Sequence, residues 1–164
     1  MSSCCGSPDS VLAAATPRCP RSGTKGVAVD LVTVNALLCE SARTAVREGP
    51  YRFCPDPACG VVYFDGEGHV FTSADLSVPV WQKEPAGARM ICYCFDENEA
   101  SMAREFTQTS RCDAARRVRD HIAAGRCACE VRNPRGACCL GDVMKAVARI
   151  DAECRPGAEN TANG

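Results

Sequence analysis

Large aromatic side chains are scarce in this chain of 164 residues, in which Phe, Trp and Tyr together make up 5%. A chain with few large rings buries only small cores, and small domains often gain stability from a bound metal. The chain also lacks a long apolar run, since none approaches the roughly 20 residues that a membrane-spanning helix needs. The net charge of −1 gives no indication of a nucleic-acid or membrane partner. We therefore expect neither membrane insertion nor nucleic-acid binding.

Groups for catalysis are lacking as well. Two histidines occur, His69 and His121, and they fall in unrelated predicted elements. The sequence has no Ser-His-Asp order and no glycine loop for a phosphate, so we do not expect an enzyme. Residues 1–6 carry no Lys or Arg, and the apolar run 11–15 is too short for a secretory signal. The expected location is the cytoplasm.

Cysteine is present in excess, with fourteen residues. Such a density is typical of a secreted disulfide scaffold or of a metal-binding protein, and the compartment decides between them. Because no secretory signal is recognisable, we favour metal binding. Cys4 and Cys5 are adjacent soft thiols near the N-terminus and are candidates for a soft metal such as Cu⁺. A terminus without a role is the alternative.

Seven of the cysteines lie between residues 92 and 139. Cys92 and Cys94 precede a helix expected over 97–107 and capped by Asp96, and a later group precedes a helix that begins at Leu140. Two thiolates one residue apart can ligate one iron, and a later pair can ligate the second iron of a [2Fe–2S] cluster. The N-termini of both helices would offer N–H groups to this anionic centre.

The sequence resembles the amino-terminal region of CopZ-type metallochaperones, whose cluster domain is similar to bacterioferritin-associated ferredoxin. The resemblance is carried by Cys-Tyr-Cys at 92–94, by the segment 129–139 with its Asn-Pro-Arg-Gly turn, and by the upstream segments 51–54 and 59–64. It implies a zinc-binding domain followed by a [2Fe–2S] domain.

The resemblance also implies the cluster ligands, which would be Cys92, Cys94, Cys129 and one of Cys138 or Cys139. Adjacent side chains point in opposite directions, so only one of the last two can serve the same iron. We favour Cys139, because it lies at the start of the last helix, where free N–H groups should lower its thiol pKa. Buried cysteines without a metal, or a structural zinc site, are the alternatives.

A second cysteine group lies in the N-terminal half. Cys54 and Cys59 flank a turn with two prolines between strand-like segments, as in the hairpin of a zinc ribbon. Cys19 lies in another tight turn, where Ser22 stands in the position of a second cysteine in the commoner form of the resemblance. We predict that zinc is bound by Cys19, Cys54 and Cys59.

The fourth zinc ligand stays open. Cys39, the Asp56 carboxylate, a cysteine of the N-terminal tail and water are the alternatives. His69 is less favoured, because a lone histidine at the start of a strand is more often solvent-facing.

The expected fold is α+β, with a small zinc-ribbon-like, β-rich N-terminal half and a small helical [2Fe–2S] C-terminal half. Strands are expected over residues 27–34, 51–53, 61–64, 69–71 and 78–81. Helices are expected over residues 35–47, 97–107, 113–124, with Gly125 as a C-cap, and from 140 onward. We divide the chain into a disordered tail (1–18), a zinc-binding domain (19–81), a linker (82–89), a cluster domain (90–154) and a second disordered tail (155–164).

Three functions follow from these sites. The first, implied by the resemblance, is a metallochaperone for copper in which the cluster is a one-electron centre, with a copper or other soft-metal transporter and a redox partner as its partners. The others are an electron-transfer protein without metal cargo, and a structural or regulatory zinc module. The chain contains no Met-x-Cys-x-x-Cys copper loop, so the candidate copper ligands are Cys4, Cys5, Cys127 and Cys138. The arginines at 116, 117 and 119 are expected on an outward helix face, either solvated or in contact with an acidic redox partner.

Overall fold

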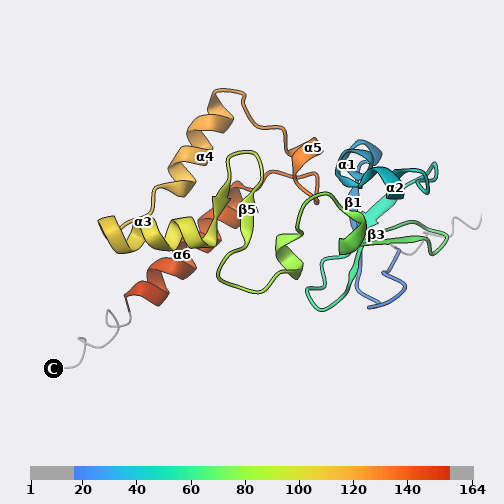
Figure 1. Ribbon diagram of the computed structural model, residues 1–164, viewed down its shortest axis with the longest axis horizontal. Helices are drawn as coiled ribbons and strands as arrows, with labels where there is room; N and C mark the ends of the chain where they lie inside the picture. The colour runs from blue at the N-terminus through green and yellow to red at the C-terminus, as the bar shows by residue number, and fades with distance from the viewer. Residues whose placement is uncertain (1–16, 156–164) are drawn as a thin grey trace, which may run out of the picture.

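The computed structural model describes residues 17–155. Within this range the chain forms two lobes (Figure 1): a four-stranded sheet with two short helices, and a helical lobe with a two-stranded sheet. The fold is therefore α+β, as the sequence predicts. No helix in the described range is long and apolar enough to cross a membrane.

The sheet lobe is an antiparallel meander in which each strand pairs with the next along the chain. Its strands are β1 (Val27–Val29), β2 (Tyr51–Phe53), β3 (Val61–Phe64) and β4 (Val70–Thr72). The predicted strands over 51–53 and 61–64 are confirmed. All four residues of β3 are buried, because this strand contributes to the main core of the lobe and to a smaller core around three cysteines.

The strand expected over 27–34 is wrong beyond Val29. The Asp30 carboxylate accepts a hydrogen bond from the Val32 N–H (3.0 Å) and caps α1 (Leu31–Leu37), so the chain turns into a helix at this point. Packing of the helix against the sheet outweighs the β preference of its valines.

The helix expected over 35–47 is interrupted. The regular helix ends before Leu38, whose backbone is extended, and a second short helix, α2 (Glu40–Arg43), follows Cys39. Leu38 is fully buried in the sheet-lobe core, and the Cys39 N–H donates to the Asp75 C=O (2.8 Å). The break places Leu38 in the core and gives the backbone at Cys39 a partner outside the helix.

The edge strand expected over 78–81 is also wrong, since η2 (Trp81–Lys83) is a short 3-10 helix there. The backbone of this segment forms hydrogen bonds with a side chain and not with a neighbouring strand. The Trp81 N–H donates to the Tyr93 hydroxyl (3.0 Å), which in turn donates to the Pro79 C=O (2.7 Å). Trp81 packs against the core of the helical lobe, so this segment connects the two lobes.

The helical lobe has α3 and α4 packed against α6, with β5 beside α6. Its elements are β5 (Met90–Cys92), β6 (Glu97–Asn98), α3 (Glu99–Thr109), α4 (Ala114–Ala123), α5 (Cys129–Arg132) and α6 (Leu140–Cys154). Its core includes the buried side chains of Ile91, Met102, Phe106, Val118, Val143 and Ile150.

The start of α3 differs from the expectation over 97–107. Asp96 does not cap the helix, because it has a φ of +55° and lies in the turn between β5 and β6. Asn98 is the cap, and its side-chain oxygen accepts a hydrogen bond from the Ser101 N–H (2.9 Å). Glu97 pairs with Cys92 in the small sheet, which delays the helix by two residues.

The last two long helices lie close to their predicted positions. The helix expected over 113–124 is α4, one residue shorter at each end. Gly125, with a φ of +69°, is not the C-cap itself but follows it, and its N–H donates to the Ile122 C=O (2.9 Å). The predicted start of α6 at Leu140 is confirmed, with Cys139 as its N-cap.

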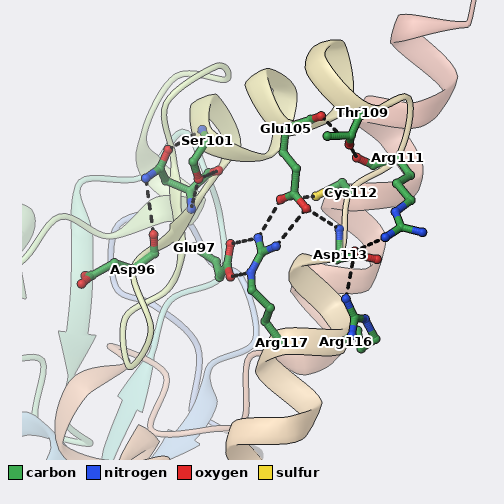
Figure 2. A network of polar contacts seen from close by, with 11 residues as sticks. Asp96, Glu97, Ser101, Glu105, Thr109, Arg111, Cys112, Asp113, Arg116 and Arg117 are labelled. Atoms are coloured by element: carbon green, nitrogen blue, oxygen red, sulfur yellow. Dashed lines mark hydrogen bonds and ion pairs between the residues drawn. The ribbon is translucent and has the colours of Figure 1, made fainter.

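A partly buried ion network joins β6, α3 and α4 (Figure 2). Arg117 of α4 donates to Glu97 (2.7 Å) and to Glu105 (2.8 Å). The hydrogen bonds from Arg117 lower the pKa of Glu105 to about 2. The expectation that Arg117 faces outward with its neighbours is therefore wrong, whereas Arg116 and Arg119 are exposed.

Candidate metal centres

Three cysteines of the sheet lobe meet in the knuckle, formed by residues 19–24 and 54–59. Cys54 follows β2, Cys59 precedes β3, and Cys19 opens a turn in which the Gly23 N–H donates to the Cys19 C=O (2.8 Å). All three side chains are buried, and their sulfurs lie within 4.8 Å of one another. The structure therefore brings the three predicted zinc ligands together.

The spacing and protonation of these thiols suit zinc. The sulfurs of Cys19 and Cys59 are 3.8 Å apart, which is the separation of about 3.8 Å that two thiolates have on a tetrahedral zinc with bonds of about 2.3 Å. Burial raises the pKa of Cys54. Burial also acts to raise the pKa of Cys19, but hydrogen bonds from Ser22 and Arg21 outweigh it and lower that pKa to about 7. Zinc binding would displace the protons of these thiols, and the lowered pKa of Cys19 makes its proton easier to displace.

Other candidate zinc ligands lie elsewhere or have other partners. Cys39 is at the N-cap of α2, and the Asp56 carboxylate accepts a hydrogen bond within its own turn (2.9 Å). The His69 ring lies edge-on to an aromatic ring of β4, with 4.8 Å between the ring centres. None of them joins the three sulfurs among the residues from 17 to 155. Cys4 and Cys5 lie outside the described residues.

Four cysteines of the helical lobe converge from two segments. Cys92 ends β5 and Cys94 follows it, while Cys129 begins α5 and Cys139 caps α6. The sulfurs of Cys94 and Cys129 are 3.8 Å apart, and Cys92 and Cys139 pack together in the core of the helical lobe. Each close pair therefore takes one sulfur from each segment. The spacing alone suggested that Cys92 pairs with Cys94. The structure instead places each of them beside a cysteine of the other segment.

Hydrogen bonds and burial set the protonation of this group. The contact with Cys139 lowers the pKa of Cys92 to about 7, and the same contact raises the pKa of Cys139. The expected lowering of the Cys139 pKa by the helix terminus is therefore wrong for the metal-free thiols, because the Cys92 contact outweighs it. Burial, and then the neighbouring Cys94, raises the pKa of Cys129 to about 12. A metal at this site must displace protons.

Adjacent Cys138 and Cys139 have opposite environments. Cys139 is 2% exposed and packs with Cys92 in the core, whereas Cys138 is exposed. The geometry therefore places Cys139 with the other three sulfurs. Of the remaining cysteines of the lobe, Cys127 and Cys154 are exposed and Cys112 is partly buried.

The loop that leads to Cys139 is held by the sheet lobe. Tyr63 of β3 donates from its buried hydroxyl to the Pro134 C=O (2.8 Å). Burial raises the pKa of Tyr63, so the phenol keeps its proton for this bond. A side chain at Gly136 would come within 2.7 Å of the Thr33 hydroxyl of α1, and the φ of +63° at Gly136 also favours glycine. The sheet lobe and this loop are therefore in close contact.

Sequence reasoning missed the side chains that support the two centres. Lys83 donates to the C=O groups of Cys54 (3.0 Å) and Asp56 (2.8 Å), while Tyr93 binds the segment before η2 and Tyr63 binds the loop that leads to Cys139, here called the cluster loop after the predicted cluster. Their partners lie between 12 and 71 positions away in the chain, so no local pattern marks them. The one available signal was the position of Tyr93 between two predicted ligands.

Comparisons with known proteins agree with this geometry. Residues 16–77 match the CopZ family model described as a zinc binding domain. The X-ray structure of the Archaeoglobus fulgidus CopZ N-terminal domain is similar over 79% of this chain and 96% of that one, with 29% sequence identity and a TM-score of 0.64. The chain resembles a CopZ N-terminal domain. No curated protein matches the sequence.

The comparisons bear on the two lobes differently. The match over residues 16–77 covers the sheet lobe with Cys19, Cys54 and Cys59, so this lobe is similar to a CopZ zinc-binding domain and has three cysteines that could hold a metal ion. The structural similarity extends beyond it into the helical lobe, because it covers 79% of the chain. The expected resemblance to a CopZ-type region is thus confirmed. The cluster and its ligands stay a prediction.

Proposed function

We propose that the protein is a metal-handling chaperone and not an enzyme, with a structural zinc in the sheet lobe and a [2Fe–2S] cluster in the helical lobe. The proposed cluster ligands are Cys92, Cys94, Cys129 and Cys139. The similarity to a CopZ N-terminal domain supports a role in metal handling. The arrangement of the four sulfurs supports the cluster.

The observation that carries the proposal is that these four sulfurs form two separate pairs. A single tetrahedral zinc would hold all four sulfurs about 3.8 Å from one another. The Cys94 and Cys129 sulfurs have this spacing, at 3.8 Å, and Cys92 contacts Cys139. Within residues 17–155, however, no three of the four sulfurs lie within 4.8 Å of one another. Two close pairs suit a centre of two metals, each with two thiolates, better than a single ion.

Backbone donors complete the site. The Ala128 N–H donates to the Cys94 sulfur (3.3 Å), and the backbone of Cys139 acts to lower the pKa of Cys129. Such bonds stabilise thiolates against protonation, and they tune the potential of a cluster bound to them. When bound, a [2Fe–2S] cluster supplies one-electron transfer. The protein residues hold four thiolates in place and keep three of them buried, with Cys94 partly exposed.

Cu⁺ is the proposed cargo. Soft thiolates favour this ion, and Cys127 and Cys138 offer exposed sulfurs in the helical lobe. Cys4 and Cys5 are further candidates outside the described residues. The proposed partners are a copper or other soft-metal transporter that receives the ion and a redox partner that exchanges electrons with the cluster, in the cytoplasm.

An electron-transfer protein without metal cargo is the second candidate. It is favoured by the partial exposure of Cys94, because a ligand sulfur at the surface shortens the path for an electron to a bound partner. This candidate requires the cluster but none of the exposed thiols.

Metal analysis of anaerobically purified protein tests the proposal. We expect about two irons, two acid-labile sulfides and one zinc per chain. Added Cu⁺ should be retained against a competing chelator, and a variant with Cys127→Ser and Cys138→Ser should retain less. Retention unchanged in that variant would assign the cargo to other thiols, and no retention by the wild type would favour the electron-transfer candidate. Protein without iron and sulfide after reconstitution would contradict both.

A further inference from the structure

The three sulfurs of the knuckle would leave one position of a tetrahedral site open, and the Ser22 hydroxyl lies beside them. Its hydroxyl oxygen lies 3.5 Å from the Cys54 sulfur and also contacts the Cys19 sulfur. The Thr24 N–H donates to the same oxygen (3.3 Å) and fixes its position within the turn. Ser22 is thus a partly buried hydroxyl directed at two of the three zinc-ligand candidates.

The distances agree with a shared metal. Two sulfurs on a tetrahedral zinc are about 3.8 Å apart, and with a Zn–O bond of about 2.1 Å a sulfur and an oxygen on the same ion are about 3.6 Å apart. The knuckle shows 3.8 Å between the Cys19 and Cys59 sulfurs and 3.5 Å between the Cys54 sulfur and the Ser22 oxygen. Both edges therefore have the lengths that one ion with three sulfurs and one oxygen requires.

We propose that Ser22 supplies the fourth zinc ligand, which gives a site of three thiolates and one hydroxyl oxygen. This inference rests on the proposed zinc in the sheet lobe. The Ser22 turn is part of the knuckle, whereas Cys39, Asp56 and His69 do not join the three sulfurs within the described range. The position that a second cysteine takes in the commoner form of this turn is therefore filled by a weaker oxygen ligand.

The oxygen ligand has a chemical consequence. Three thiolates leave a zinc site with one negative charge, whereas four would leave two, and a neutral hydroxyl binds zinc less strongly than a thiolate does. The position held by Ser22 is therefore the exchangeable one. An incoming soft ligand, such as a small thiol, would displace the serine oxygen before any of the cysteines.

X-ray absorption at the zinc edge tests the proposal on the purified protein, because it detects zinc and is blind to iron. The wild type should show three sulfur neighbours and one oxygen, and Ser22→Cys should show four sulfurs. Release of zinc to a chelator should be slower in Ser22→Cys than in the wild type. In Ser22→Ala we expect about 10-fold weaker zinc binding, the low end of the loss for a residue that supports a metal site.

Ser41→Ala is the matched control, because its hydroxyl also contacts a cysteine sulfur, that of Cys39 at 3.3 Å, which belongs to no metal group among the described residues. It should leave both the zinc-edge spectrum and zinc release unchanged. Four sulfurs in the wild type would overturn the proposal and indicate a cysteine outside residues 17–155. Three sulfurs in Ser22→Cys, or wild-type zinc binding in Ser22→Ala, would overturn it as well. Protein without zinc would overturn the zinc site itself, which is a different result from bound zinc that is insensitive to Ser22.

Discussion

Cys138 and Cys139 show how much one residue position decides in this protein. Cys139 is the N-cap of α6 and lies in the core beside Cys92, while the neighbouring Cys138 is exposed. Their sulfurs therefore have different chemistry, although the residues are identical and adjacent. One completes a group of four buried or partly buried thiols, and the other is free to meet a soft metal or an oxidant.

Substitution of each residue in turn tests this assignment. Cys139→Ser should lose the cluster or change its absorption spectrum to that of an oxygen-ligated iron, because Cys92 would lose its partner sulfur. Cys138→Ser should keep the wild-type spectrum and lose at most one Cu⁺ equivalent. The opposite outcome would reverse the assignment, and a disrupted spectrum in both variants would show that the conformation of the loop matters more than either sulfur.

At the scale of elements, Arg117 connects β6, α3 and α4 near the Cys92 turn. Its partners are Glu97, which is 7% exposed, and Glu105. Arg117→Met should lower the free energy of unfolding by about 2–3 kcal/mol, because it leaves the buried Glu97 and the partly buried Glu105 without this partner. Arg116→Met is the control, since Arg116 is exposed and pairs only with Asp113 (2.9 Å). Urea unfolding monitored by circular dichroism measures both, and equal effects would contradict the structural role of Arg117.

The same network predicts a dependence on pH. The hydrogen bonds from Arg117 lower the pKa of Glu105 from 4.5 to about 2. The stabilisation that the ionised Glu105 carboxylate contributes is present in full above its ordinary pKa of 4.5 and is lost as the pH falls toward about 2. Between about pH 7 and about pH 3, the metal-free wild type should therefore lose more stability than Arg117→Met. An equal loss in the two proteins would show that Glu105 is not held by Arg117.

Local patterns predicted some elements and missed others for physical reasons. The segment 51–53 alternates, the segment 61–64 is a short apolar run, and both are bounded by turn residues. Helix α6 has clear helical periodicity, so the positions of these elements follow from the sequence. The segment 27–34 is rich in β-branched residues, and the Asp30 cap and packing on the sheet convert its second half into α1. Cysteine spacing likewise predicted which thiols gather. It did not predict that Cys94 pairs with Cys129, because that contact depends on how α5 is placed.

At the scale of the whole molecule, the two lobes contact each other through tyrosine hydroxyls. Tyr63 reaches from the sheet lobe to Pro134 in the cluster loop, and Tyr93 reaches from the Cys92 turn to Pro79. Both segments that carry the proposed cluster ligands are therefore anchored outside the helical lobe. The sheet lobe supports the geometry of the cluster site through these contacts.

Tyr63→Phe tests this support. The change leaves the Pro134 C=O buried without its donor, at a cost of about 1–3 kcal/mol. We expect faster loss of the cluster to an iron chelator, with unchanged zinc content. Tyr51→Phe is the matched control, because Tyr51 is also buried in the sheet lobe but its hydroxyl accepts from the Arg47 N–H (3.0 Å), away from the cluster loop. Equal rates of cluster loss in both variants would contradict a specific role for Tyr63.

Removal of the proposed zinc ligand Cys54 should separate the two proposed metal centres. Cys54→Ser should abolish stoichiometric zinc and loosen the knuckle, while the cluster spectrum stays intact. Tyr63, which binds the loop that leads to Cys139, belongs to the main core of the sheet lobe, whereas Cys54 belongs to the smaller core around the knuckle. Loss of Cys54 should therefore leave the Tyr63 contact in place. Zinc analysis, hydrogen exchange and absorption spectroscopy measure the three effects. Loss of zinc and cluster together would show that the lobes do not hold their metals independently.

The central claim is that Cys92, Cys94, Cys129 and Cys139 hold a two-iron cluster, and electron paramagnetic resonance tests it most directly. Protein reconstituted anaerobically and reduced by one electron should give a signal that integrates to about one spin per two irons, with no signal before reduction. The signal should persist in Cys138→Ser. A colourless protein that stays silent after reduction and carries zinc at these four cysteines would contradict the account.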